Sequence, residues 1–338
     1  MLLETLCNAN GVSGNEDEVR EIIINEIKPY ADKITIDTLG NLIAFKKGKS
    51  SEKKVMLSAH MDEVGFIISK ITDEGYLKFK TVGGIDTRVI LGKKVTVANR
   101  VKGIIGVKAV HLLSESEKGT IPKVSDIYID IGATSKEEAE KYVSIGDYAV
   151  FDTKFEKLGG NRIKAKAIDD RAGCYIISKI LREEPVFDLY VCFTAQEEVG
   201  LRGAGVCAKR IKPDMALVVE STTCADVYKT PKSEMVTELG KGAVLSFMDR
   251  TTIVNKSYLD RLTEFAKTNN ISWQYKNMTS GGNDAGSIHL SSGGILTASV
   301  SVPCRYIHSP ACIADTFDIE SAFAFVRAYL KNIGGILS

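Results

Sequence analysis

Histidine and carboxylate side chains stand at or near the ends of several predicted buried strands in this 338-residue chain. These residues are His60, Asp62, Asp169, Asp170, Glu197, Glu198, Glu220 and His308. Because ligands of open α/β sheets bind outside the carboxyl ends of the strands, we expect five segments far apart in the sequence to converge at one sheet edge. Nitrogen and oxygen donors of this kind suit Zn, Co or Mn, and no cysteine lies in these segments at ligand spacing.

The set contains enough ligands for two metal ions. Two metals about 3.5–4 Å apart need a shared carboxylate, one histidine and one further carboxylate each, and a base that stays unligated. Taken singly, each piece has a structural explanation: Asp169 and Asp170 could cap a helix, and His308 could belong to a turn. Glu197 and Glu198, however, follow a buried strand, where like charges repel unless something neutralises them. For the whole set we therefore predict a metal site.

Alternating helices and strands must position these residues. Apolar spacing predicts helices over 15–30, 171–182, 203–210, 258–269 and 319–333. Continuous apolar runs predict buried strands over 53–58, 189–194 and 215–220. Strands separated by helices indicate an α/β domain with a mostly parallel sheet that is covered on both faces.

A β-rich block interrupts this alternation from about residue 68 to residue 162. Its short runs are divided by Gly and Asn turns, as is typical of a small barrel or sandwich. It also holds a polar loop over 114–125, followed by a short helix. We therefore predict a discontinuous catalytic domain, 1–67 and 163–338, with a small β-barrel-like domain, 68–162, inserted into it.

Charge and composition exclude several classes of protein. Lys and Arg number 44 against 43 Asp and Glu, and without a basic stripe we expect no binding to nucleic acid or an anionic membrane. No apolar run approaches the ~18 residues that span a bilayer, and the first residues lack the features of a secretory signal. Seven cysteines without paired spacing fit reduced thiols. These features predict a cytoplasmic protein.

The motifs together resemble the M42 family of metallo-aminopeptidases. HMDEVG, DDRAG and QEEVG occur in this order, followed by SGGNDAG and IHSP, and the resemblance runs nearly end to end. It implies a zinc-peptidase-like catalytic domain and an inserted domain for dimerisation and assembly. It also implies dimers that build a tetrahedral dodecamer, and an enzyme that removes N-terminal residues from short peptides with a free amino terminus.

The resemblance also implies two divalent metal ions per subunit, most naturally Zn or Co. Asp169 would bridge the two metals. His60 and Glu220 would complete one metal site, and Glu198 and His308 would complete the other.

The same resemblance makes Glu197 and Asp62 the catalytic residues. Glu197 would be the general base on a water shared by the metals, and Asp62 would orient His60. Two positions depart from the family pattern. Many relatives have Asp where this chain has Glu220, and Thr is expected at Asn283. Metal affinity and the preferred substrate side chain therefore stay open.

Other functions remain as alternatives. Some relatives have carried glucanase labels, but sugar-ring platforms are usually aromatic and this chain has a single tryptophan, Trp273. A metal-dependent deacylase would use the same ligands on an N-acyl compound. A scaffold without activity is disfavoured by the intact set of candidate ligands.

Overall fold

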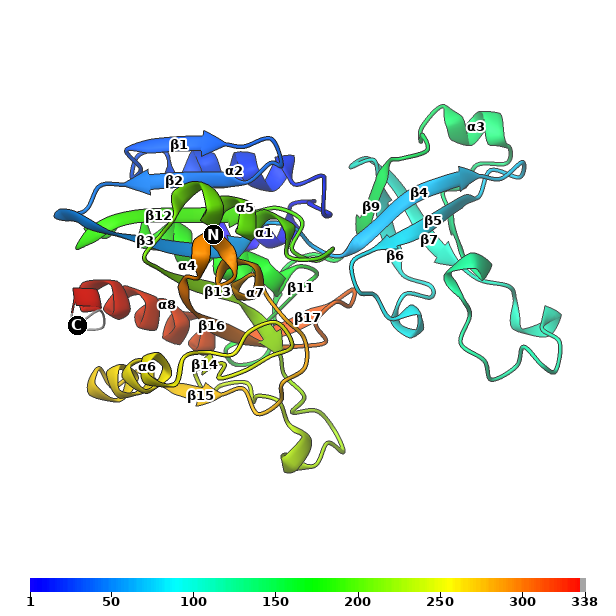
Figure 1. The fold of residues 1–338 in the computed structure, drawn as a ribbon. Coiled ribbons are helices and arrows are strands. Elements are labelled where there is room, and N and C mark those ends of the chain that lie inside the picture. The colour runs from blue at the N-terminus through cyan, green and yellow to red at the C-terminus, as the bar shows by residue number, and fades with distance from the viewer. Residues whose placement is uncertain (335–338) are drawn as a thin grey trace.

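The computed structural model describes residues 1–334 and shows an α/β body with a β-barrel set to one side of it (Figure 1). The barrel is closed, in the strand order β4-β5-β8-β7-β6-β9. Its elements are β4 (Gly65–Ile71), β5 (Leu77–Val82), β6 (Lys94–Val97), β7 (Val101–Gly106), β8 (Tyr128–Asp130), β9 (Tyr148–Phe151) and the helix α3 (Lys136–Glu140). The predicted barrel-like insertion is thus confirmed.

The body is built on an eleven-stranded sheet whose main path runs β1-β2-β12-β3-β13-β16-β17-β11-β10. These strands are β1 (Lys33–Ile36), β2 (Leu42–Lys46), β3 (Ser50–His60), β10 (Glu156–Lys157), β11 (Arg162–Ala165), β12 (Phe187–Thr194), β13 (Met215–Thr223), β16 (Leu296–Arg305) and β17 (Cys312–Asp315), with β14 (Ala243–Leu245) and β15 (Trp273–Tyr275) beside β16. The central strands β12, β3, β13 and β16 pair in parallel. Towards both edges of the path the pairs are antiparallel, so the predicted parallel sheet holds at the centre and the sheet as a whole is mixed.

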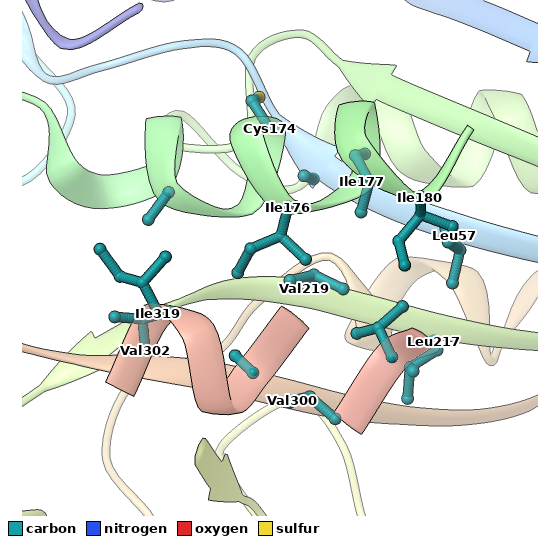
Figure 2. Packing of buried hydrophobic residues seen from close by; sticks show 14 of the residues in the cluster. Leu57, Cys174, Ile176, Ile177, Ile180, Leu217, Val219, Val300, Val302 and Ile319 are labelled. Carbon is teal, nitrogen blue, oxygen red and sulfur yellow. The ribbon is translucent and has the colours of Figure 1, made fainter. Parts of the chain in front are cut away.

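Helices cover both faces of this sheet. On one face lie α1 (Leu2–Asn8), α2 (Asp17–Ile27), α4 (Ile168–Ile180), α6 (Lys256–Thr268) and α8 (Thr316–Lys331), and on the other lie α5 (Arg202–Ile211) and α7 (Ala285–Ile288). Successive residues of a strand point to opposite faces, so Leu217 and Val219 of β13 join the first core while Ala216 and Val218 join the second. Figure 2 shows the first core, with Ile176 of α4 above Val219.

Shorter features complete the description. Five 3-10 helices are η1 (Thr87–Val89), η2 (Val110–Leu112), η3 (Val124–Asp126), η4 (Lys232–Glu234) and η5 (Ser291–Gly293). The predicted polar loop over 114–125 consists of turns and the start of η3. All seven cysteines are buried and unpaired, as the spacing predicted. Within residues 1–334, no helix has the length and apolar character that crossing a membrane requires.

Candidate active site

The parallel strands bring the predicted site residues to one end of the sheet. His60 is the last residue of β3 and pairs with Thr194, the last residue of β12. In the next strand, β13, Val218 pairs with Ser58, which places Glu220 at the level of His60. His308 follows β16 with two residues between them. The expected convergence of strand ends is therefore present.

Asp169 lies between the two histidines of this group. Its Oδ1 is 3.4 Å from Nε2 of His60, and its Oδ2 is 3.4 Å from Nε2 of His308. Glu198 approaches the same His308 nitrogen with Oε2, at 3.2 Å. One potential ligand atom from each of His60, Asp169 and Glu198 lies within 4.8 Å of the others. Asp169 thus presents one oxygen to each histidine, as a carboxylate shared by two cations must.

Glu220 is buried at the same end of the sheet but lies outside that group of three. Its Oε1 accepts hydrogen bonds from Nδ2 of Asn283, at 2.6 Å, and from Oγ of Ser301, at 3.4 Å. Glu220 and Asn283, the two positions expected to depart from the family pattern, are therefore in direct contact.

Asp62 is a fully buried carboxylate that holds several parts of the site together. Its Oδ1 lies 3.5 Å from Nδ1 of His60 and accepts the backbone N–H of Glu197, at 3.0 Å. Its Oδ2 accepts the N–H of Glu198, at 3.1 Å, and the hydroxyl of Ser13, at 2.6 Å. This carboxylate thereby fixes the backbone of the two glutamates, while Nδ1 of His60 also lies 3.1 Å from the backbone carbonyl oxygen of Asp62. The carboxylate of Glu197 itself reaches to 3.8 Å from Nε2 of His60.

The neighbours Asp169 and Asp170 have different functions. Both have non-helical backbone angles, so the regular part of α4 starts after them. Asp170 accepts the N–H of Gly173, at 2.9 Å, which is the contact of a helix cap. The capping explanation considered for this pair is therefore correct for Asp170, while Asp169 faces the histidines. Gly173 is required at this turn, because a Cβ there would lie 2.3 Å from the carbonyl oxygen of Val219.

Burial and crowding of charge perturb the pKa values throughout the site. Burial raises the pKa of Glu198 to about 7, and it raises the pKa of Glu197 and of Glu220 well above the usual range, with neighbouring carboxylates adding to the effect. Burial alone would lower the pKa of His60, but the carboxylates around it outweigh this and raise it. Likewise the pKa of His308 rises to about 9 against the effect of burial, through Asp169 and Glu198.

This donor set fits divalent metal ions. It consists of imidazole nitrogens and carboxylate oxygens without a thiolate, which suits Zn, Co or Mn. Buried carboxylates that repel one another would be neutralised by cations, which explains why a protein keeps so many acids in one place.

A cleft of about 650 Å³ opens beside His308. Its walls come from both parts of the molecule: Gly84, Asp86 and Arg88 from the barrel side, and residues 306–311 from the body. A Cβ on Gly84 would lie 3.6 Å from Nδ1 of His308, so the barrel approaches the site closely. The cleft offers space for a ligand that reaches the site at His308.

Three supporting residues lack a role in the sequence-based prediction. Ser13 holds Asp62, Asn283 holds Glu220, and Asp284 is a buried carboxylate whose Oδ2 accepts the hydroxyl of Thr194 at 2.6 Å. Burial raises the pKa of Asp284 to about 6. Asn283 and Asp284 stand in the SGGNDAG motif, but the sequence does not reveal what the three residues contact, because each contact joins segments at least 49 residues apart.

A mixed α/β body with a histidine–carboxylate cluster at its strand ends defines a class of hydrolases that work with divalent metals. Within that class, the sequence profile of the M42 glutamyl aminopeptidase family matches residues 40–325, and the chain belongs to this family. A putative aminopeptidase of Acetivibrio thermocellus is 44% identical over 95% of each chain. The lysyl aminopeptidase of Pyrococcus furiosus is 33% identical over 98% of this chain and 96% of its own.

Solved structures agree with this assignment. A TET aminopeptidase from Thaumarchaeota archaeon SCGC AB-539-E09 superposes with a TM-score of 0.95 at 37% identity, covering 99% of this chain and 98% of the other. A Thermotoga maritima protein described as an endoglucanase superposes with a TM-score of 0.84 at 37% identity, over 99% of both chains. The TET1 peptidase of Pyrococcus horikoshii, described as assembling into a tetrahedron or a large octahedral shell, has a TM-score of 0.86 at 34% identity, covering 97% of this chain and 98% of that chain.

Proposed function

We propose that this chain is an aminopeptidase that uses two divalent metal ions, Zn or Co, to remove N-terminal residues from short peptides. The observation that carries the proposal is the position of Asp169, with one oxygen 3.4 Å from His60 and the other 3.4 Å from His308. In this proposal Asp169 would be shared by the two metals. His60 and Glu220 would hold one metal, and Glu198 and His308 would hold the other.

Metals bound there would lower the pKa of a water molecule and polarise the carbonyl group of the first peptide bond. Glu197 is placed to act as the general base, since its carboxylate stands beside His60 and is not needed as a ligand. Glu197 would take a proton from the water and return it to the leaving amine. Asp62 lies beside the ring of His60 and would orient that ring as a metal ligand.

The free amino terminus of the peptide is a cation when protonated. It would lie among the carboxylates of the site, which attract positive charge. The cleft beside His308 would take the part of the peptide beyond the cleaved bond. Arg88 and Lys93 line this cleft together with a single carboxylate, Asp86, and neither wall carries an excess of negative charge. A peptide chain is therefore a better occupant than a polycation.

We further propose that the barrel mediates dimerisation and that dimers assemble into a tetrahedral dodecamer in the cytoplasm. Large apolar side chains are exposed at Val110, Leu112 and Ile121, in the segment that joins β7 to β8 of the barrel. Exposed apolar surface is often used for protein–protein contacts. The assembly described for the Pyrococcus horikoshii relative supports this proposal.

The decisive test compares free-amino aminoacyl-anilides with their N-acetylated forms. Protein stripped of metal with a chelator should be inactive on both sets, and restoring Zn or Co should restore cleavage of the free-amino set alone. The best side chain in the panel then gives the specificity.

The same panel separates the alternatives. Cleavage of only the acetylated set would instead identify a deacylase. Hydrolysis of a soluble glucan that survives exhaustive chelation would support the endoglucanase description of the Thermotoga maritima relative.

A further inference from the structure

We propose that Asn283 is a positioning residue that sets the affinity of one of the two metals, because its side-chain amide fixes the carboxylate of Glu220. This inference rests on the proposed role of Glu220 as a metal ligand. The observation behind it is the hydrogen bond from Nδ2 of Asn283 to Oε1 of Glu220, at 2.6 Å, between two buried side chains.

The contacts of Asn283 determine which way its amide faces. Its Nδ2 lies between two carboxylates, those of Glu220 and, at 3.4 Å, Asp249. Its Oδ1 accepts the backbone N–H of Ala285, at 2.8 Å. A flipped amide would set an oxygen against two acceptors and a nitrogen against a donor, so all three contacts require the same orientation.

The loop around Asn283 is held against a second loop, which makes this orientation rigid. Asp249, the other acceptor for Asn283, is itself fixed by the N–H and the hydroxyl of Thr251, at 2.7 and 2.9 Å. A Cβ at Gly282 would lie 2.5 Å from Thr251, and one at Gly286 would lie 2.4 Å from it. Glycines on either side of Asn283 thus allow the close approach of the two loops.

Asn283 leaves Glu220 with a single oxygen for any further partner. Oε1 receives the amide N–H and, more weakly, the Ser301 hydroxyl, whereas Oε2 has no hydrogen-bond partner within residues 1–334. A glutamate has one more rotatable bond than an aspartate and loses more side-chain entropy when it is fixed in one geometry. The amide offsets that cost before any metal arrives, so the carboxylate is already oriented as a ligand.

Replacing Asn283 by aspartate isolates this effect. Asn283→Asp keeps the size of the side chain and the oxygen that accepts from Ala285, but it removes the donor and turns an acceptor towards two carboxylates. Loss of a partner that orients a metal ligand typically weakens metal binding about 10- to 100-fold. We expect that loss for one metal, with the other metal bound as in the natural protein. Ser301→Ala is the matched control, since it removes only the 3.4 Å contact to the same oxygen.

The experiment titrates stripped protein with Zn and with Co, following heat by calorimetry and the Co absorption spectrum, and records the melting temperature of each stripped variant. The inference predicts two equivalents for the natural chain and for Ser301→Ala, one for Glu220→Ala, and one tight plus one weakened for Asn283→Asp.

Three results would overturn the inference in distinguishable ways. If Glu220→Ala loses one metal but Asn283→Asp binds both as tightly as the natural chain, Asn283 has no positioning function and the ligand role of Glu220 stands. If Asn283→Asp weakens both metals together and lowers the melting temperature of the stripped protein, Asn283 is only structural. Two full equivalents in Glu220→Ala would instead remove Glu220 from the proposed metal site, and the inference with it.

Discussion

Glu197 is proposed to transfer protons during the reaction and not to bind a metal ion. Its carboxylate lies 3.8 Å from Nε2 of His60, whereas its neighbour Glu198 lies in the group of three potential ligand atoms. We expect Glu197→Gln to keep both metals and to lower kcat by at least about 10²- to 10⁴-fold, because glutamine cannot accept the proton. Elemental analysis and steady-state kinetics on the same preparation check this. Near-normal turnover in metal-loaded protein would remove Glu197 as the base.

His60, in contrast, is proposed to bind a metal ion and not to transfer protons. Its Nε2 faces Asp169 at 3.4 Å, and its ring is oriented by Asp62. His60→Ala should therefore leave one metal equivalent per subunit in place of two. His289→Ala is a suitable control, because the His289 ring hydrogen-bonds the carbonyl oxygen of Ala285 in its own helix and is not a proposed ligand. Two full equivalents in His60→Ala would contradict the ligand assignment.

A buried ion network joins the elements that carry the site. Oε1 of Glu63 accepts from Nζ of Lys166, from the N–H of Gly11 at 3.1 Å and from Nη2 of Arg171 at 3.2 Å. Arg171, fully buried on α4, also donates to the carbonyl oxygen of Met61 at 2.9 Å. The start of α4, which carries Asp169, is thereby tied to the segment that follows β3.

Glu63→Gln should destabilise the protein strongly, because it leaves two buried cations without a counter-charge. Breaking a buried pair in this way typically costs about 3–5 kcal/mol. The control is Glu156→Gln, whose partner Lys164 is 3.0 Å away in a partly exposed pair and which should cost about 1 kcal/mol or less. Urea unfolding of stripped protein measures both. Equal costs for the two variants would show that the network contributes no more than a surface pair.

Sequence patterns predicted the central elements well because those elements are locally determined. The apolar runs of β12 and β13 and the apolar stripe of α2 are visible within a few residues, and these elements lie where they were expected. The antiparallel pairing of β11 with β17 was not predicted, since it joins segments about 150 residues apart. Asp169 and Asp170 also look alike in sequence, and only the start of α4 separates the residue that faces the histidines from the cap.

At the scale of the whole molecule, the barrel presents apolar surface that a single chain leaves uncovered. Val110, Leu112 and Ile121 are 73%, 61% and 57% exposed. If they form the proposed contact between subunits, Leu112→Asp should reduce the mass measured by light scattering after gel filtration, because a buried charge without a partner opposes association. Leu112→Met, which keeps the apolar character, should leave the mass unchanged. An unchanged mass in the aspartate variant would exclude Leu112 from the contact.

The pH dependence of folding stability tests whether the charged groups of the site are arranged to bind metal ions. In stripped protein, the pKa of Glu198 is about 7, against an ordinary value of 4.5. Folding therefore favours the protonated form of Glu198, and the stability that this group contributes at low pH is lost as the pH rises from about 4.5 to 7. His308, with a pKa of about 9 against 6.5, contributes stability below pH 6.5 that is lost as the pH rises through 9. Asp62, whose pKa is lowered, contributes fully above pH 4 and does not offset these losses.

Stripped protein should therefore melt at progressively lower temperatures from pH 5 to pH 9. We expect a fall of at least about 5 °C, since each kcal/mol corresponds to a few degrees in a protein of this size. Protein loaded with Zn should melt higher at every pH above about 6 and lose less over the range, because metal ions stabilise the deprotonated ligands and bind only the folded chain. Differential scanning calorimetry on both forms provides the comparison. A melting temperature of stripped protein that stays level or rises with pH would mean that the buried carboxylates and histidines compensate one another without any metal.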